Sequence, residues 1–414
     1  MDRRDFLKSA LTIAALAPLA KLHAKAGADG DKSSDVVSEP GVTRRRYKET
    51  AMTLPLLGFG CMRLPRLSPD KPEIDFDTAA KMIDMAMKAG CNYFDTAYMY
   101  HGGDSEKFVG RVLSKYPRES YYLTSKMPIV MMRSEADNER IFSEQLARTK
   151  AGYFDFYFMH WLNEKHWEMA QRFKTLDFMK KMQKEGKIRR LGFSFHGEPE
   201  TLKKIAEAYG WDLVQIQLNY LDWELCRSRE QYELLTKLGI PVSVMEPLKG
   251  GTLVRLTPEA KKVFEKANPK VSAASWGLRY VASLPNVQVV LSGMSALEHM
   301  EDNIRTFAPL KPLTDAERKV IAEALAAYRK SGAVPCTACR YCSPCPVGVD
   351  IPRNLALLNQ VKGGLPLFHA KLVYDAMGED ERASSCVGCG ACLKKCPQQI
   401  KIPTFMKQIA QEFK

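Results

Sequence analysis

The chain has 414 residues, 45 % of them hydrophobic and 26 % charged, which is typical of a soluble globular protein and excludes a disordered one. This length exceeds what a single hydrophobic core usually absorbs, so we expect two domains and additional segments. The formal net charge is +13, but the basic residues are scattered among acidic ones, and no basic–aromatic patch indicates nucleic-acid binding.

The N-terminus has the pattern of an export signal. Arg3 and Arg4 lie in a charged start, Ala10–Ala20 is an uncharged run, and Ala24 and Ala26 form a small-residue Ala-x-Ala site. These three features together are typical of a secretory signal. The paired arginines resemble the twin-arginine class, which exports proteins already folded. The alternative is an amphipathic helix that happens to carry two arginines.

We therefore expect a twin-arginine signal peptide over residues 1–26 and a flexible linker over 27–43, which is rich in Asp, Ser and Gly. The protein would then be periplasmic or otherwise exported. The apolar run of the signal is far shorter than the roughly 20 residues that span a bilayer. The mature chain is thus expected to have no transmembrane helix.

From Leu54 onward, short apolar runs rich in β-forming residues alternate with longer amphipathic stretches. The runs are Leu57–Cys61, Cys91–Phe94, Tyr121–Thr124, Phe156–Met159, Arg190–Phe193, Leu213–Gln217, Val242–Met245 and Val287–Leu291. Helical patterns between them include Phe76–Lys88, Glu106–Leu113, Asn138–Lys150 and His166–Lys184. This alternation favours a (β/α)8 TIM barrel over an open doubly wound sheet, since no Gly-x-Gly-x-x-Gly opens a helix. We expect the barrel over 44–315, with a small hairpin at Arg44–Pro55 across its bottom.

Polar side chains follow the predicted strands, at the end where barrels of this type carry their chemistry. Asp95 ends the second strand and Tyr100 follows it, Lys126 ends the third strand, and His160 ends the fourth. A phenol titrates near pH ~10, and a neighbouring ammonium makes its anion easier to form. We therefore expect Lys126, held by Asp95, to tune Tyr100 as the proton donor in carbonyl reduction. His160 would orient the carbonyl by hydrogen bonding.

Each of these residues also has a purely structural interpretation. Asp95 could cap a helix, Lys126 could be a solvated loop charge, and His160 could be a core histidine. Tyr98 is a competing phenol, but the spacing from Asp95 and the glycines that follow favour Tyr100. The occurrence of all four in register at one barrel mouth favours the catalytic interpretation.

The motif Phe-Asp-Thr-Ala-x-x-Tyr at 94–100, Ser-Lys at 125–126 and His160 resemble the catalytic tetrad of the aldo-keto reductase family. The resemblance covers about residues 50–310 and implies an oxidoreductase that interconverts a small carbonyl substrate and its alcohol. It also implies a nicotinamide cofactor, NAD or NADP, held by Ser194, Gln215, Leu248, Gly250, Gly293, Ser295 and Asn303.

The sequence departs from the family around this cofactor site. Phe195 stands where Asn is usual, Met245 where many members have an aromatic residue, and Glu246 where Ser is common. The segment 293–303 offers only His299 as a basic residue, so it lacks an arginine for a 2′-phosphate. These departures favour NAD, or no nicotinamide, over NADP.

Eight of the 11 cysteines form two copies of one loop after residue 335. Three thiolates at i, i+3 and i+6 can hold three corners of a cubane, and the Cys before Pro normally serves the other cluster. We therefore expect a mostly helical, ferredoxin-like domain over 330–414 with two [4Fe–4S] clusters and helices near Asn354–Asn359 and Leu365–Met377. One cluster would use Cys336, Cys339, Cys342 and Cys396, and the other Cys386, Cys389, Cys392 and Cys345.

Alternatives remain for these cysteines. The first copy has two residues rather than three before its last Cys, which leaves the partner of Cys345 open. Structural zinc usually takes separated Cys pairs, and disulfides suit an exported protein.

Together these features predict an exported iron–sulfur oxidoreductase of the aldo-keto reductase branch with a ferredoxin-type tail. Tyr100 would be its proton donor, and the clusters would relay electrons between the barrel and a redox partner protein. Two alternatives are a non-catalytic barrel that serves as an electron-transfer or binding module, and an ordinary NAD(P)H-dependent reductase with structural clusters.

Overall fold

The computed structural model of the chain describes residues 36–37, 41–68 and 73–414. The chain divides into two compact units, residues 1–37 and 38–414, and only β1 (Val36–Val37) is described in the first. The second unit contains a closed barrel in which eight parallel strands are hydrogen-bonded in the order β10-β11-β4-β5-β6-β7-β8-β9. They are β4 (Leu57–Gly60), β5 (Tyr93–Asp95), β6 (Tyr122–Met127), β7 (Phe154–Leu162), β8 (Ile188–Phe195), β9 (Leu213–Gln217), β10 (Val242–Met245) and β11 (Val287–Ser292). The predicted TIM barrel is confirmed.

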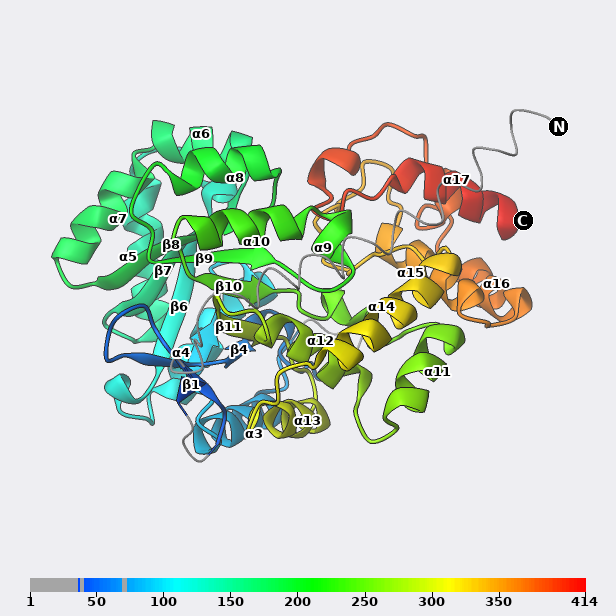
Figure 1. Cartoon of the computed structure of the whole chain (residues 1–414). Coiled ribbons are helices and arrows are strands. Elements are labelled where there is room, and N and C mark those ends of the chain that lie inside the picture. Colours follow the sequence, from blue (N-terminus) through cyan, green and yellow to red (C-terminus); the bar gives the residue numbers. More distant parts are fainter. Residues whose placement is uncertain (1–35, 38–40, 69–72) are drawn as a thin grey trace. The chain divides into compact units, whose positions relative to one another are not determined.

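Amphipathic helices surround this barrel (Figure 1). The helices that connect consecutive strands are α3 (Phe76–Lys88), α4 (Asp104–Leu113), α5 (Asp137–Thr149), α6 (Glu164–Arg172), α7 (Thr175–Lys184), α8 (Pro199–Ala206), α9 (Asp222–Leu225), α10 (Ser228–Lys237), α11 (Pro258–Ala267) and α12 (Ala273–Ala282). After the last strand follow α13 (Leu297–Phe307) and α14 (Asp315–Lys330). Helix α3 has the predicted bounds because Asp75 caps it by accepting from the backbone N–H of Thr78, 3.1 Å away.

The single helix predicted over His166–Lys184 is wrong. The segment forms two helices, α6 and α7, because Lys174 has a left-handed backbone (φ 49°) that ends the helical path. The carbonyl of Phe173 instead accepts from Nδ2 of Asn138 at 2.7 Å. A long-range side-chain contact therefore decides this break, and the local periodicity does not reveal it.

The predicted hairpin is present as the antiparallel pair β2 (Arg44–Arg46) and β3 (Thr53–Pro55). Nη1 of Arg45 donates to the carbonyl of Leu284 at 3.0 Å, and the hydroxyl of Tyr47 donates to the carbonyl of Asp212 at 2.6 Å. Both carbonyls lie just before barrel strands begin. The hairpin thus covers the N-terminal end of the barrel, and the opposite end carries the site described below.

The tail is mostly helical, as predicted (Figure 1, orange to red). It contains α15 (Ile351–Lys362), α16 (Leu367–Asp375) and α17 (Ile402–Glu412), with short 3-10 turns η7 (Ala383–Ser385) and η8 (Leu393–Lys395). Its apolar side chains form a core separate from that of the barrel, centred on Leu355, Leu358, Met406 and Ile409. Helix α17 was not among the predicted elements.

The predicted signal peptide over 1–26 and most of the predicted linker over 27–43 lie outside the described residues. At the end of that linker, Val42 and Thr43 are buried, and their backbone N–H groups donate to the carbonyls of Ala89 and Phe307. Within the ranges that the structure describes, every helix is too short or too polar to cross a lipid bilayer.

Candidate active site

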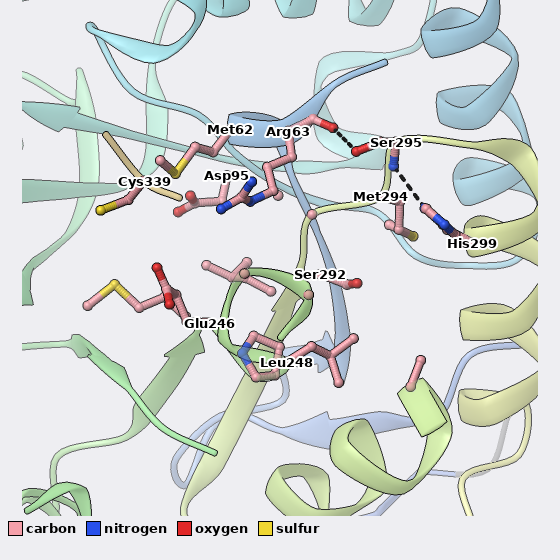
Figure 2. Close-up of a pocket in the computed structure, with 18 of the residues that line it drawn as sticks. Met62, Arg63, Asp95, Glu246, Leu248, Ser292, Met294, Ser295, His299 and Cys339 are labelled. Atoms are coloured by element: carbon pink, nitrogen blue, oxygen red, sulfur yellow. Dashed lines mark hydrogen bonds between the residues drawn. The ribbon is translucent and has the colours of Figure 1, made fainter. Parts of the chain in front are cut away.

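The four predicted catalytic side chains meet at the C-terminal end of the barrel. Asp95 ends β5, Tyr100 opens the 3-10 turn η3 (Tyr100–Gly103), Lys126 lies in β6, and His160 lies in β7. Asp95, Tyr100 and His160 line a cavity of about 550 Å³. Figure 2 shows this cavity with Asp95 at its wall. Lys126 is fully buried and contacts Asp95.

The ammonium group of Lys126 connects the other residues of this group. Its Nζ donates to Oδ1 of Asp95 at 2.6 Å and to the carbonyl of Thr96 at 2.7 Å. The Tyr100 hydroxyl lies at the limit of hydrogen bonding, 3.5 Å from the same Nζ. The predicted pairing of Asp95 with Lys126 is therefore present, and the Tyr100 hydroxyl is the more distant neighbour of the ammonium group.

Burial dominates the electrostatics of this group. It raises the pKa of Asp95 and lowers the pKa of Lys126, while their ion pair opposes both shifts. The pKa of Tyr100 lies well above its usual value because the phenol is buried and faces Asp95. This is opposite to the expected lowering by Lys126, whose charge Asp95 already balances. Tyr100 is thus held in its protonated form.

His160 lies beside the phenol with its ring edge-on to that of Tyr100, the centroids being 5.8 Å apart. Burial is the main cause that lowers its pKa well below the usual value, with the Lys126 charge as a further cause. Its Nδ1 is buried and has no hydrogen-bond partner among the described residues. A neutral imidazole at the cavity wall can hydrogen-bond a substrate oxygen.

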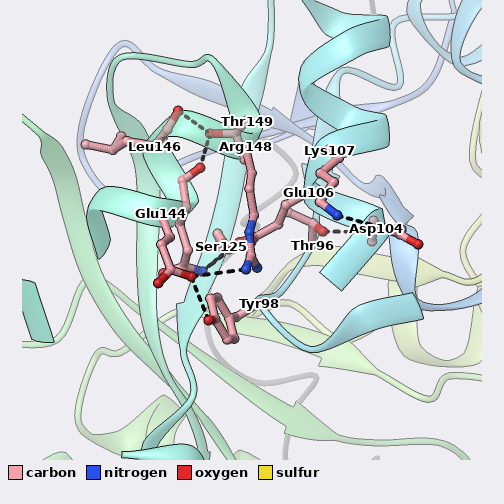
Figure 3. A network of polar contacts seen from close by, with 12 residues as sticks. Thr96, Tyr98, Asp104, Glu106, Lys107, Ser125, Glu144, Leu146, Arg148 and Thr149 are labelled. Atoms are coloured by element: carbon pink, nitrogen blue, oxygen red, sulfur yellow. Dashed lines mark hydrogen bonds and ion pairs between the residues drawn. The ribbon is translucent and has the colours of Figure 1, made fainter. Parts of the chain in front are cut away.

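The competing phenol, Tyr98, points away from the cavity. Its hydroxyl donates to Oε2 of Glu144 at 2.7 Å, in a polar network between the helices outside the barrel (Figure 3). Tyr98 does not line the cavity, whereas Tyr100 does. Of the two phenols, only Tyr100 is therefore in a position to meet a substrate there.

The same network reaches the buried carboxylate of Glu106, which sequence reasoning did not single out as a site residue. Glu106 accepts from Oγ of Ser125 and from Nε2 of Gln145, both at 2.6 Å. The same Nε2 lies 3.1 Å from the carbonyl of Lys126 and donates to it as well. The network therefore fixes the backbone of the strand that presents Lys126.

The cavity wall also contains every residue expected to hold a nicotinamide cofactor, namely Ser194, Gln215, Leu248, Gly250, Gly293, Ser295 and Asn303. Several of their polar groups bond to the protein itself. Nε2 of Gln215 donates to Asp95 at 3.3 Å, and Oγ of Ser194 accepts from the backbone N–H of Trp161 at 2.8 Å. Nδ2 of Asn303 donates to Oγ of Ser292 at 2.7 Å.

Arg63 is a cavity residue that the sequence did not reveal, because it follows the first strand without a recognisable motif. Figure 2 shows its side chain reaching into the cavity toward Asp95. Its Nη2 donates to the carbonyl of Thr337 at 2.8 Å, and its own carbonyl accepts from the hydroxyl of Ser295 at 2.8 Å. Burial raises the pKa of Glu246, on the opposite wall, while Lys249 and Arg63 oppose this shift.

The cavity extends well beyond the catalytic group. It runs from the catalytic group to His299 and Asn303 on α13, along the two loops expected to hold the cofactor. Arg255, outside the segment considered in the sequence, also lines it and is a cation that could meet a phosphate. Its guanidinium would lie 3.3 Å from a Cβ placed on Gly251.

Two tail residues, Cys339 and Tyr341, line this barrel cavity. The ring of Tyr341 stacks on that of Trp161, with centroids 4.1 Å apart and planes 20° from parallel. Gly250 packs against Thr337 so closely that a Cβ would lie 2.6 Å from the Thr337 carbonyl. The tail therefore forms part of the cavity wall, which the sequence did not indicate.

The eight tail cysteines surround two small cavities as free thiols. We call the first group the proximal set, because Cys339 also lines the large cavity; it contains Cys336, Cys339, Cys342 and Cys396. We call Cys345, Cys386, Cys389 and Cys392 the distal set; they line the second cavity, to which Cys342 of the proximal set also contributes. Each set contains three cysteines of one copy and the last cysteine of the other, the grouping expected from the sequence for the ligands of two clusters; that ligand assignment stays a prediction. Four thiolates around one cavity fit a [4Fe–4S] cluster.

The tail is also anchored to the barrel through Gln398, which is 3 % exposed. It exchanges hydrogen bonds with Gln217 at 2.7 and 3.0 Å. Its Oε1 also accepts from Nζ of Lys249, which pairs with Asp222 at 2.5 Å without solvent exposure. These contacts hold the loop of Cys396 against the ends of β9 and β10.

Comparison with known proteins agrees with this two-part organisation. A sequence model of the aldo/keto reductase family matches residues 56–326, and one of a 4Fe-4S dicluster domain matches residues 335–400. An uncharacterized oxidoreductase of Bacillus subtilis, YqkF, is 24 % identical over 67 % of this chain and 95 % of its own length. The NADH-specific methylglyoxal reductase of Escherichia coli is 26 % identical over 49 % of this chain and 67 % of its own length.

A probable aldo-keto reductase of Glycine max is 28 % identical, and the match spans 56 % of its length. Among solved structures, aldo-keto reductase AKR11C1 of Bacillus halodurans matches with a TM-score of 0.58 and 24 % identity, over 69 % of this chain and 96 % of its own. A Klebsiella pneumoniae aldo/keto reductase, solved with NADP and acetate, matches with a TM-score of 0.55 and 22 % identity, over 70 % and 96 %. These structures share the barrel fold.

Proposed function

Because the chain belongs to the aldo/keto reductase family, we propose that it is an exported iron–sulfur oxidoreductase that interconverts a small carbonyl compound and its alcohol. Electrons would pass between the barrel and a redox partner through two [4Fe–4S] clusters. One observation carries this proposal: Cys339 of the proximal set lines the same cavity as Asp95, Tyr100 and His160.

In carbonyl reduction the carbonyl carbon gains a hydride, and the oxygen gains a proton. Tyr100 supplies that proton from its hydroxyl, which burial keeps protonated. Lys126 stabilises the phenolate that is left, from 3.5 Å away. His160 holds the carbonyl oxygen by a hydrogen bond. In alcohol oxidation the same groups act in reverse.

When bound, a nicotinamide supplies or accepts the hydride, and the clusters carry single electrons. Ser194, Gln215 and Asn303 would hold the dinucleotide, since they line the cavity that extends from the catalytic group to α13. The named activity of the E. coli relative supports a small carbonyl substrate. The NADP in the K. pneumoniae structure supports a nicotinamide cofactor, with Arg255 as a candidate phosphate contact.

Export through the twin-arginine route is proposed from Arg3, Arg4 and the apolar run that follows them. Cluster assembly needs reduced thiols, so a route for folded proteins suits eight cysteine ligands. Replacing Arg3 and Arg4 by lysine should leave the protein in the cytoplasm with its signal uncut. Retained export of that variant would exclude this route.

A second candidate is an ordinary reductase in which the clusters only support structure. The packing of Thr337 on Gly250 and the buried bonds of Gln398 favour it, because both fix the tail to the barrel. Anaerobic native mass spectrometry would count iron and sulfide and detect a bound dinucleotide. Reduction potentials that do not change on substrate addition would support purely structural clusters.

The catalytic assignment is tested by Tyr100→Phe with Tyr98→Phe as its matched control. Loss of the Tyr100 hydroxyl should lower kcat by about 10²–10⁴-fold, because general acid catalysis contributes that much. The Tyr98 hydroxyl donates to Glu144 outside the cavity, so its loss should change kcat little. Equal activity of both variants would exclude Tyr100 as the proton donor.

A further inference from the structure

The two cysteine loops of the tail are copies of one pattern, so the positions from the first to the third cysteine of one loop have equivalents in the other. From Cys336 and Cys386 onward, Thr337 is equivalent to Val387, and Tyr341 to Ala391. The comparison shows which surface of each copy is covered and which is exposed.

The surface of the first copy is covered by the barrel. Thr337 is 1 % exposed, and its carbonyl accepts from Arg63. Tyr341 stacks on Trp161 at the barrel mouth. The loop around the proximal set thus contacts the barrel, the domain with which its cluster would exchange electrons.

In the second copy the position equivalent to Thr337 is exposed: Val387 is 69 % exposed. Leu393, six residues further along the same loop, is 46 % exposed, so two apolar side chains of this copy face outward. Cys389 of the distal set is also exposed. A shallow hollow adjoins this surface and is lined by Val387, Pro403, Thr404 and other residues of η7 and α17.

The exposed surface is basic at its edge. Lys394 and Lys395 are exposed next to Leu393, and Lys407 and Lys414 line the hollow. No Asp or Glu is among the described residues that line it. We call Val387, Cys389, Leu393 and these four lysines the distal patch.

We propose that the distal patch docks an acidic electron-carrier protein that exchanges single electrons with the cluster of the distal set. The first copy supports this proposal by analogy, since there the equivalent part of the loop is covered by the barrel, with which the proximal cluster would exchange electrons. Val387 and Leu393 would supply the apolar centre, and the lysines would attract a negatively charged partner. This inference rests on the proposed function, in which electrons leave or enter the protein through the tail.

Each docking event moves one electron, and no bond forms or breaks. A reduced carrier loses one electron, and the distal cluster gains it; the direction reverses for alcohol oxidation. Two such events supply the electron pair of one carbonyl–alcohol conversion. Electron-transfer encounters of this kind are weak and bury little surface, so a small exposed patch is sufficient.

The test uses the intact holoprotein under anaerobic conditions and a reduced plant-type [2Fe–2S] ferredoxin as the acidic probe. Stopped-flow absorbance would record the rate of electron transfer to the clusters over a range of ionic strength. The rate should fall as salt increases, because salt screens the attraction. The double variant Lys394→Glu/Lys395→Glu should slow the reaction by roughly tenfold or more at low salt, since electrostatic steering contributes 10–10³-fold. Val387→Asp should slow it as well.

The matched control is Lys181→Glu/Lys184→Glu on α7 of the barrel, which makes the same charge change and should keep the wild-type rate. Reduction of each variant by dithionite and its EPR spin count would show that both clusters are intact. Equal rates for patch and control variants would overturn the proposal. A faster reaction of the holoprotein with a basic c-type cytochrome than with the ferredoxin would also overturn it. Binding to anionic lipid vesicles that depends on the distal patch would overturn it as well, because the occupant would then be a membrane surface. Tyr100→Phe should leave the ferredoxin rate unchanged, so a failure of the catalytic proposal is distinguishable from a failure of docking.

Discussion

Trp161 and Tyr341 stack face to face, with ring centroids 4.1 Å apart, and they join the barrel to the tail at the cavity. Trp161 follows His160 directly, and Tyr341 lies between Cys339 and Cys342 of the proximal set. The backbone of Trp161 is left-handed (φ 59°), a conformation that costs about 1–3 kcal/mol in a bulky residue. Because strained residues cluster at functional sites, we expect the stack to take part in electron exchange between tail and cavity.

Removing the ring of Tyr341 should therefore slow electron exchange between the proximal cluster and the cavity. Tyr341→Leu loses the stack, which contributes about 0.5–1.5 kcal/mol beyond burial, whereas Tyr341→Phe keeps it. Rapid-freeze EPR after substrate is added to reduced protein would follow the oxidation of the cluster. Slow oxidation in Tyr341→Leu and wild-type oxidation in Tyr341→Phe is the expected pair of results. Identical rates in both variants would show that the stack serves only packing.

The ion pair of Lys126 and Asp95 should contribute to stability only as a pair. Lys126→Met leaves the Asp95 carboxylate buried without its cation, which should destabilise the protein by about 3–5 kcal/mol. Lys126→Met/Asp95→Leu removes both charges and should recover most of the lost thermal stability without restoring turnover. The thermal unfolding midpoints of the single and double variants would measure this. A double variant as unstable as the single one would show that the carboxylate is not the cause.

The barrel and the catalytic group are predictable from the sequence because their signals are local. Each strand is a short apolar run, and Asp95 and His160 stand next to such runs. The contacts of Tyr341 and Thr337 with the barrel are not predictable in this way. They depend on how two domains pack, and residues that are distant in sequence carry no local mark of that packing. Arg63 is not predictable either, since it follows the first strand without a recognisable motif and its guanidinium bonds to the distant tail carbonyl of Thr337.

The crossed arrangement of the cysteines can be tested by comparing Cys396→Ser with Cys345→Ser. Cys396 lies with the proximal set and Cys345 with the distal set. Cys396→Ser should therefore damage the cluster at the barrel and leave rapid exchange with an external carrier intact. Cys345→Ser should slow exchange with the carrier and leave the proximal EPR signal sensitive to substrate. The reverse pattern would mean that each loop keeps its own fourth cysteine.

Histidines with lowered pKa values at the barrel mouth should make the protein less stable in acid. Burial, with a smaller effect of His166, lowers the pKa of His196 from 6.5 to about 4. Between these two values the unfolded chain binds a proton that the folded protein excludes, so stability is complete above pH 6.5 and falls as the pH decreases toward 4. The loss from this residue amounts to about 3 kcal/mol, at about 1.4 kcal/mol for each unit of pKa.

His196→Gln should therefore reduce the difference between the thermal unfolding midpoints at pH 7 and pH 5, because glutamine does not titrate. The matched control, His369→Gln, changes an exposed histidine on α16 and should leave that difference as in the wild type. The visible absorbance of the clusters would show that they remain bound at both pH values. If His196→Gln keeps the wild-type difference between the two unfolding midpoints, other groups cause the acid sensitivity. His160, whose pKa burial also lowers, would then be the next residue to substitute.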